Sequence, residues 1–187
     1  MKYAIEVNKL RKEFGLKTAV KDISFQVQEK TLFSLLGVNG AGKTTTIRML
    51  TGLSRPTSGE AFVLGHSITK DLNEVKKVSN LSPQDTAVAP NLSVRENLEF
   101  IAGIYNMDKQ TIQERINEMI QLFSLQEVEN SKAKTLSGGW QRKLSIAMAL
   151  ITDPKVLYLD EPTLGLDVLA RKDLWRIIER LKKKVTI

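Results

Sequence analysis

One eight-residue segment, residues 37–44, restricts the fold more than any other part of the sequence. It reads GVNGAGKT, follows the apolar run 31–36 and precedes a helical pattern over residues 43–53. The apolar run is typical of a strand buried on both faces of a parallel sheet. A glycine-rich turn between such a strand and a helix lets backbone N–H groups converge on an anion, and the helix dipole adds positive charge. We therefore predict a phosphate-binding loop at residues 37–44.

The residue types in this loop also predict what it binds. Lys43 is placed to reach the β- and γ-phosphates of a nucleotide, and the Thr44 hydroxyl is placed to ligate Mg²⁺. The segment alone leaves the base, adenine or guanine, open. The predicted nucleotide contacts of the segment are Gly37, Val38, Asn39, Gly40, Ala41, Gly42, Lys43, Thr44 and Thr45.

The rest of the chain alternates short strand patterns with helices. Strands are expected at 3–8, 22–28, 60–64, 78–81 and 156–159, and the last residues, 185–187, begin another strand. Helices are expected at 71–77, from 93 to 104, around 112–123, at 139–151 and at 168–184. Asp71 with Glu74, and Ser93 with Glu96, are each spaced as a capping box. We predict an α/β core from residues 1–84 and 136–187, interrupted by an all-helical insert at 85–135.

Composition excludes several classes of protein. Hydrophobic residues make up 42% and charged residues 26% of the 187 positions, as in ordinary globular proteins. The absence of cysteine excludes disulfides and thiolate metal sites, and suits a reducing cytoplasm. No apolar run approaches the roughly 18 to 20 residues that span a bilayer, and the N-terminus lacks the apolar core of a signal peptide. The net charge of +7 fits either scattered surface charge, which we favour, or a surface for nucleic acid or anionic lipid.

Two acidic residues follow the apolar strand 156–159. Strands of a parallel sheet present their carboxyl ends to the ligand crevice, so Asp160 and Glu161 are expected to face a bound nucleotide. We predict that Asp160 holds Mg²⁺ and that Glu161 orients and deprotonates the attacking water. The alternative is that both are polar loop residues, but the upstream phosphate loop favours the catalytic interpretation.

A tetrad, Leu-Ser-Gly-Gly, opens the helical pattern before that strand. Alone it indicates only an N-capped helix. In its order and spacing with the acid pair, however, the sequence closely resembles the ABC ATPase family over essentially its whole length. The matching positions are Leu136, Ser137, Gly138, Gly139, Ala149, Leu150, Pro154, Asp160, Glu161, Pro162, Thr163, Gly165, Leu166 and Asp167.

The resemblance implies a P-loop NTPase fold, with a RecA-like parallel sheet, an N-terminal antiparallel β subdomain and an inserted helical subdomain. It implies that Phe14 stacks on adenine, for which a core position beside Leu10 is the alternative. Gln84 matches the glutamine that contacts Mg²⁺ or water and transmits the nucleotide state to a partner. The tetrad residues Ser137, Gly138 and Gly139 match the signature that closes over ATP held by another subunit, and Asp167 matches a loop at that interface.

The resemblance further implies a head-to-tail dimer of ATPase domains with two ATP molecules between them. The sequence departs from the family at Trp140, where glutamine is usual. It also lacks the family's switch histidine, expected just past residues 185–187, and His66 lies too early in the chain to replace it. We therefore expect a C-terminally truncated piece of a longer protein, which binds ATP and hydrolyses it slowly.

Three classes of function remain open. We favour the ATPase subunit of a transporter, coupled to a separate transmembrane permease and a second copy of an ABC ATPase, at the inner face of the membrane. The insert and the acid-pair run resemble exporters of the drug-resistance type. The alternatives are a soluble ABC ATPase acting on ribosomes or nucleic acid, which we do not expect, and an inert nucleotide-binding module. Val88 and Leu92 are either permease contacts or core residues of the insert.

Overall fold

A computed structural model describes residues 2–105 and 107–187. Contacts within the chain divide it into two compact units, which we describe separately. The first comprises the residues up to Asn80, Lys155–Asp160 and Leu181–Ile187, and the second comprises Leu81–Pro154 and Glu161–Arg180. The predicted boundaries of a helical insert at 85 and 135 stay a prediction. In the described ranges, no helix is both long enough and apolar enough to cross a membrane.

The first unit contains a four-stranded antiparallel sheet. Its strands are β1 (Tyr3–Phe14), β2 (Lys17–Gln28), β3 (Ser58–Val63) and β4 (His66–Ser67), in the order β2-β1-β3-β4. In the register, Val7 pairs with Phe25 on one side and with Ala61 on the other. β1 and β2 are longer than predicted because their register shifts at bulges, where Lys9 and Asp22 adopt positive φ and interrupt the alternation of apolar residues.

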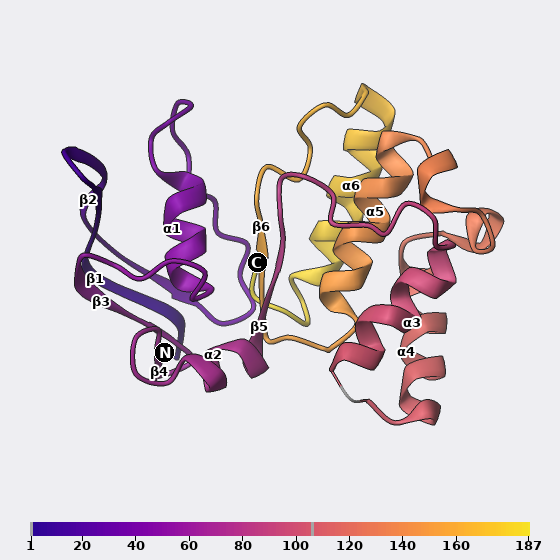
Figure 1. Ribbon diagram of the computed structural model, residues 1–187, viewed down its shortest axis with the longest axis horizontal. Helices are drawn as coiled ribbons and strands as arrows, with labels where there is room; N and C mark the ends of the chain where they lie inside the picture. The colour runs from indigo at the N-terminus through magenta and orange to yellow at the C-terminus, as the bar shows by residue number, and fades with distance from the viewer. Residues whose placement is uncertain (1, 106) are drawn as a thin grey trace. The chain divides into compact units, whose positions relative to one another are not determined.

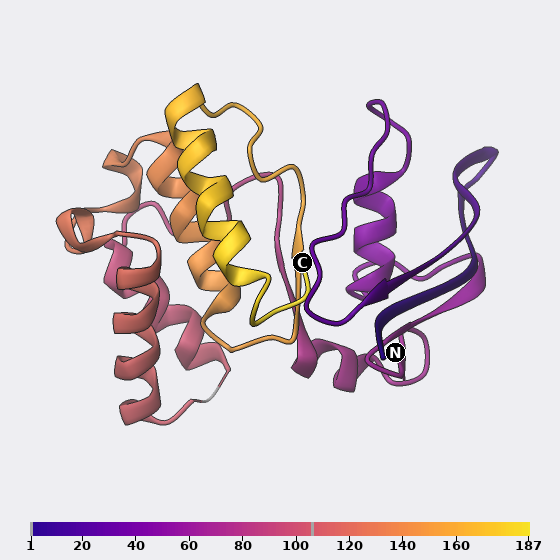
Figure 2. The same cartoon turned by 180° about the vertical axis from the view of Figure 1, so that it is seen from behind.

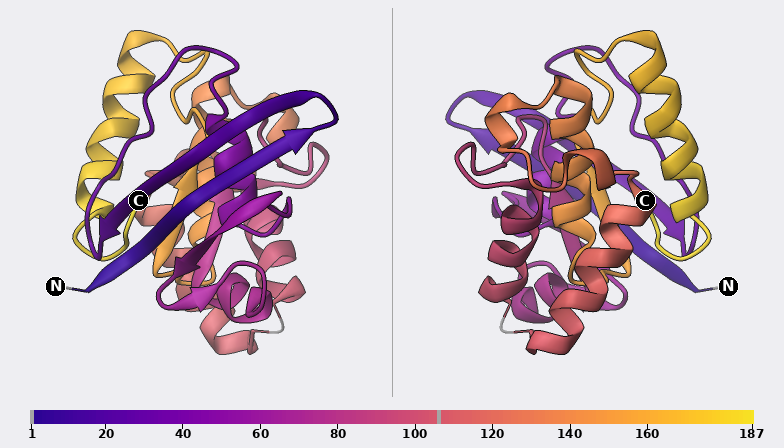
Figure 3. Two further views of the ribbon diagram at one scale, coloured as in Figure 1. Left: turned by 90° about the vertical axis from the view of Figure 1, so that its left-hand side faces the viewer. Right: turned by 90° about the vertical axis from the view of Figure 1, so that its right-hand side faces the viewer.

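Helix α1 (Lys43–Leu50) packs against this sheet and contacts β2 and β3. The strands pass across the helix in the left view of Figure 3. Burying the apolar side of a sheet under a helix is the usual way of building such a core. The buried apolar residues of these elements are Ala4, Ile5, Val7, Leu10, Val20, Val27, Ile47, Met49, Leu50, Ala61 and Val63.

A second set of strands forms the parallel sheet, and one of them, β5, begins in the first unit and ends in the second. β5 (Ser79–Ser82) and β6 (Val156–Leu159) form a two-stranded sheet, and Val156 pairs with Thr186 in a parallel bridge. Ile187 in turn donates its N–H to the Thr31 carbonyl at 2.9 Å and accepts from the N–H of Phe33 at 2.8 Å. These contacts bring segments from three distant parts of the sequence together beside β6.

The predicted buried strand at residues 31–36 is wrong. The structure has no strand there, and the Leu36 side chain is 92% exposed. The reason is that, among the described residues, the backbone bonds of this segment to Ile187 are confined to Thr31 and Phe33, which is too few to form a strand. The Phe33 ring instead stacks on Phe25, with ring centroids 5.2 Å apart.

The second unit is a group of helices. It contains α3 (Val94–Ile104), α4 (Lys109–Leu122), α5 (Gly138–Leu150) and α6 (Val168–Leu181), with short 3-10 turns at Gln126–Val128 and Ala133–Thr135. Figures 1 and 2 both show α5 and α6 side by side. The largest fully buried side chains here include Leu98, Ile116, Met119, Phe123, Leu125, Leu144 and Ile146.

The two predicted capping boxes have different outcomes. At α3 the prediction is confirmed, since Ser93 accepts from the Glu96 N–H and Glu96 accepts from the Ser93 N–H. At α2 (Leu72–Val78) the prediction is wrong, because Asp71 makes no side-chain cap. Its carboxylate instead accepts from the N–H of Ser67 at 3.0 Å, so it holds the preceding turn.

Candidate functional site

The glycine-rich segment 37–44 lies in the first unit and leads directly into α1. Gly40 and Gly42 have φ values of 82° and 89°, which favour glycine. A Cβ on Gly42 would lie only 2.4 Å from the Ala19 carbonyl oxygen, so this glycine is also required by close contact with β2. No side chain caps the start of α1, which leaves its first N–H groups available to an anion.

The Lys43 side chain folds back over this loop. Its ammonium group donates to the carbonyl oxygens of Gly37 at 2.9 Å and Val38 at 3.2 Å. The positive charge of Lys43 therefore lies over the loop in which we predict that the nucleotide phosphates bind. Thr45, in the first turn of α1, is half-buried.

Thr44 and Asp160 meet although 116 residues separate them in sequence. The Thr44 hydroxyl donates to the Asp160 carboxylate at 3.1 Å. Asp160 directly follows β6, and its side chain is buried, with the residue 5% exposed. A buried carboxylate needs such a partner, because an unpaired charge in the interior is costly.

This pair of oxygen atoms fits a magnesium ion. Mg²⁺ is usually held by one or two protein oxygens and completed by water and phosphate oxygens. In the described part of the chain, no group of three or more His, Cys, Asp or Glu side chains could form an all-protein metal site. Thr44 and Asp160 would thus hold the ion only together with a bound nucleotide.

Phe14 ends β1 beside the hairpin turn, and its side chain is 55% exposed. The Lys12 ammonium lies 4.9 Å from the centre of the ring. The alternative that Phe14 is a core residue is therefore wrong. An exposed ring remains able to stack on a base.

The predicted signature residues begin α5 in the second unit. Ser137 is the N-cap, and its hydroxyl accepts from the Trp140 N–H at 3.5 Å. The two glycines differ, because a Cβ at Gly138 would meet nothing within 4 Å, whereas one at Gly139 would lie 3.2 Å from the Ala170 side chain. Packing therefore accounts for glycine at 139 but not at 138, where the bare backbone is open to a ligand.

Glu161, Asp167 and Gln84 also lie in the second unit. Glu161 has a φ of 47°, a left-handed conformation that is unusual for a side-chain-bearing residue and recurs at functional sites. The Asp167 carboxylate accepts from the Ala170 N–H at 2.9 Å and so caps α6. Gln84 is exposed just beyond β5. The structure thus places Phe14, residues 37–45 and Asp160 in the first unit, and Gln84, Ser137–Gly139, Glu161 and Asp167 in the second.

Sequence reasoning missed Arg142 in α5. This residue is only 5% exposed, and its guanidinium donates to the carbonyl oxygens of Pro83 and Gln84. The available signal was an arginine placed within a helix whose following residues, 144–151, are almost all apolar or small. Buried arginines require such acceptors, so the residue could have been singled out.

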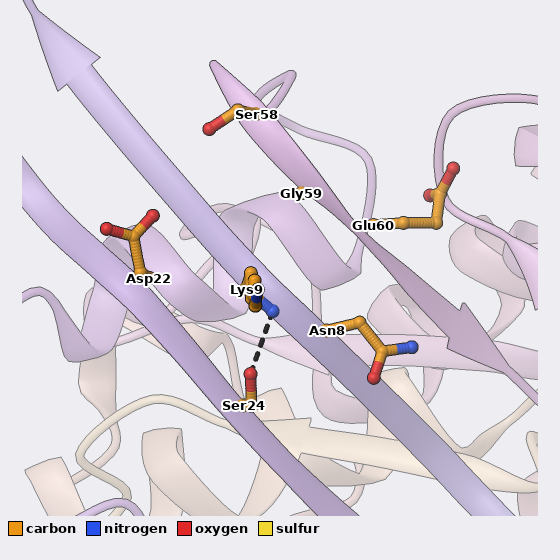
Figure 4. Close-up of a pocket in the computed structure, with 7 residues that line it drawn as sticks. All are labelled: Asn8, Lys9, Asp22, Ser24, Ser58, Gly59 and Glu60. Carbon is orange, nitrogen blue, oxygen red and sulfur yellow. Dashed lines mark hydrogen bonds between the residues drawn. The ribbon is translucent and has the colours of Figure 1, made fainter.

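A separate hollow of about 570 Å³ lies on the antiparallel sheet (Figure 4). Across it, the Lys9 N–H donates to the Ser24 hydroxyl at 2.8 Å. None of the residues predicted to bind nucleotide lines this hollow. Its lining residues are Asn8, Lys9, Asp22, Ser24, Ser58, Gly59 and Glu60.

Comparison with known proteins identifies sequence relatives. The family described as "ABC transporter" matches residues 20–164. The human phospholipid-transporting ATPase ABCA3 is 41% identical over 187 residues, which cover 98% of this chain and 11% of that protein. The ABC transporter A family member 10 of Arabidopsis thaliana is 41% identical over 173 residues, 91% of this chain and 19% of that protein. The chain thus spans only a small part of each relative's length.

Solved structures show the same fold. The structure of cbiO1 from Clostridium perfringens, described as part of the ABC transporter complex cbiONQ, has a TM-score of 0.89 at 24% identity, covering 100% of this chain and 77% of that chain. A structure described as the ATP binding subunit of an ABC transporter has a TM-score of 0.83 at 26% identity, covering 98% and 78%. The predicted α/β fold, with a parallel core and an antiparallel β subdomain, is confirmed by these likenesses.

Proposed function

This chain belongs to the ABC transporter family, and from that premise we propose that it hydrolyses ATP to drive a separate transmembrane permease, in the direction of export. The observation that carries the proposal is the hydrogen bond between Thr44 and Asp160. It joins the end of the glycine-rich loop to the carboxylate that follows β6. Phosphoryl transfer needs the Thr44 and Asp160 oxygens close together, because the metal ion that they would hold binds next to the phosphates.

In this proposal, residues 37–45 hold the ATP phosphates, and Lys43 exchanges its loop carbonyls for β- and γ-phosphate oxygens. Thr44, Asp160 and Gln84 would hold Mg²⁺, which would neutralise the charge that develops on the phosphates. Glu161 accepts a proton from the attacking water. Phe14 stacks on adenine.

The proposed active form pairs two ATPase domains head to tail. The open backbone at Gly138 and the N-terminal end of α5 support a contact between Ser137–Gly139 and the γ-phosphate bound to the second copy. Asp167 lies at the same interface in this proposal. The second copy is either an identical chain or a related one, and nucleic acid is not a partner.

The permease is proposed to dock beside Gln84 and the helices of the second unit, which places the chain at the inner face of the membrane. The cargo contacts the permease and not this chain. The human relative is named as a phospholipid-transporting ATPase, so phospholipids are the first class of cargo to test.

ATP binding by this chain is the first experiment. We expect titration calorimetry to show ATP binding that tightens with Mg²⁺, and Thr44→Val to remove the Mg²⁺ effect while binding without the ion persists. Thr111→Val is a matched control, since that threonine hydroxyl donates to the local helix cap Asp108 and is remote in sequence from the glycine-rich loop. Failure of the wild-type chain to bind ATP, or an unchanged Mg²⁺ effect in Thr44→Val, would contradict the proposal.

The remaining parts of the proposal need the complete protein. Glu161→Gln should trap an ATP-bound dimer, seen by light scattering, and a scattering mass that stays monomeric in ATP would exclude the head-to-tail form. Purification from mild detergent should bring down a polytopic membrane protein in near-equal amount. Recovery of ribosomes or nucleic acid instead would favour the soluble class of ABC ATPase.

A further inference from the structure

Three consecutive polar residues in α5 each reach a different segment of the second unit. The Gln141 amide donates to the carbonyl oxygens of Ala133 and Leu136, at 3.1 and 3.2 Å, and so holds the loop that precedes the helix. Lys143 contacts the Asp173 carboxylate of α6 at 2.5 Å. Successive side chains on a helix point about 100° apart, so this turn of α5 can bind three neighbours at once.

The middle residue, Arg142, binds the segment that carries Gln84. Its two terminal nitrogens donate to the carbonyl oxygens of Pro83, at 2.7 Å, and of Gln84. In an extended strand, successive carbonyls point in opposite directions. One guanidinium reaches both because the backbone bends at residues 84 and 85, so the arginine fixes the conformation of this bend.

A second contact lies one turn further along α5. The hydroxyls of Ser82 and Ser145 are 3.0 Å apart, and both residues are buried. Residues 142 and 145 lie on one side of the helix. Residues 82–84 are therefore attached to α5 at three successive positions.

Separating α5 from residues 82–84 would remove the Pro83 and Gln84 carbonyls as acceptors for a buried guanidinium. Losing hydrogen-bond acceptors costs more for a buried charge than breaking a surface contact. The bend and the helix therefore move together, and the Gln84 side chain projects from a backbone that α5 holds in place.

We propose that Arg142 is a positioning residue that fixes Gln84 to α5, so that Gln84 and the Ser137–Gly139 end of the helix respond to nucleotide as one body. This inference rests on the proposed function for its consequence in catalysis. The attachment itself is independent of nucleotide. If ATP displaces the start of α5, the Arg142 guanidinium would transmit that displacement to Gln84.

The test combines a mobility measurement with kinetics. The chain has no cysteine, so Asp85→Cys provides one site for a nitroxide label beside the bend. With Arg142→Gln, we expect the rotational correlation time of the label to shorten at least about threefold, because the bend is released. Arg142→Lys, which retains the charge and can donate to a carbonyl, should restore part of the immobilisation.

Arg115, in α4, supplies a matched control that bonds to the other end of α5. It donates to the carbonyl oxygens of Ile151, at 3.1 Å, and Leu150, at 2.7 Å, which lie at the opposite end of α5. Arg115→Gln should lower the melting temperature to a similar extent and leave the label unchanged. Equal mobility of the label in the two glutamine variants would overturn the proposal.

Kinetics in the complete protein tests the consequence for catalysis. Arg142→Gln should lower kcat at least about tenfold with KM for ATP within about twofold, because positioning and not binding is lost. A kcat equal to that of Arg115→Gln would overturn the positioning role. The mobility of the label is measured without nucleotide, so it tests whether Arg142 holds the bend even if the chain fails to bind ATP. Failure to bind ATP would contradict the proposed function alone.

Discussion

Tyr158 provides a quantitative test of how the strand before Asp160 is packed. Its hydroxyl is buried and has no hydrogen-bond partner among the described residues. A buried polar group without a partner costs about 1–3 kcal/mol relative to its solvated state. Tyr158→Phe removes the hydroxyl and keeps the ring, so we expect the free energy of unfolding to rise by about 1–2 kcal/mol.

The assay is urea unfolding followed by far-ultraviolet circular dichroism. Fluorescence is unsuitable, because Trp140 and Trp175 both lie in the second unit and Tyr158 lies in the first. For a chain of this size, each kcal/mol corresponds to roughly 2–4 °C in melting temperature. Tyr105→Phe is the control, since that side chain is 48% exposed and its change should stay within about 0.5 kcal/mol.

The same residue predicts a pH dependence. Burial raises the pKa of the Tyr158 phenol above its ordinary value. The stability of the wild-type protein should therefore not change with the ionisation of this phenol below the pKa of the unfolded chain, about 10. Above that pH the free energy of unfolding should fall, as the pH rises toward the higher pKa of the folded state. The Tyr158→Phe variant should not show this fall. A variant that is less stable than the wild type at pH 7 would refute the packing argument, because it would mean that the hydroxyl has a partner.

Three further predictions follow from local geometry. Gly42→Ala should abolish ATP binding in calorimetry and lower the melting temperature, because its Cβ would lie 2.4 Å from a backbone oxygen; normal binding would contradict the close approach. The hydrogen bond from the Ser93 N–H lowers the pKa of Glu96. The capping box should therefore stabilise α3 at pH values above the pKa of Glu96 in the unfolded chain, and this stabilisation should be lost as the pH falls through the lower pKa of the folded state. An NMR titration that gives Glu96 an ordinary or raised pKa would exclude this. Gly138→Ala should raise the melting temperature slightly, because alanine favours helix by about 1 kcal/mol, and still slow ATP turnover in the complete protein; unchanged turnover would argue against a ligand at this backbone.

The sequence was sufficient where a local pattern decides the structure. The positive φ values of Gly40 and Gly42 and the start of α1 at Lys43 follow from the spacing of glycines before a helix. The capping box at Ser93 follows in the same way. The sequence also assigned Thr44 and Asp160 to one metal ion, and the 3.1 Å hydrogen bond between them supports that assignment, which stays a prediction.

Prediction failed where distant residues decide the outcome. Residues 31–36 have the apolar pattern of a buried strand, but a strand needs a partner along its length, and within the described ranges its bonds to Ile187 are limited to Thr31 and Phe33. Asp71 has the spacing of a cap and is drawn to the Ser67 N–H instead. Arg142 is functional, in our proposal, through carbonyl groups about 60 residues earlier in the chain, a contact that no helical periodicity reveals.

The turn between β1 and β2 has a practical use. Leu16, at its tip, is fully exposed, and Gly15 beside it adopts a φ of 57° that allows the tight reversal. Since the sequence contains no cysteine, Leu16→Cys would introduce the sole thiol. A single fluorophore could be attached there without first replacing native cysteines. Phe14, the proposed adenine-stacking residue, lies two positions away. The fluorescence of the dye should therefore change when nucleotide binds, which would allow binding to be followed in real time.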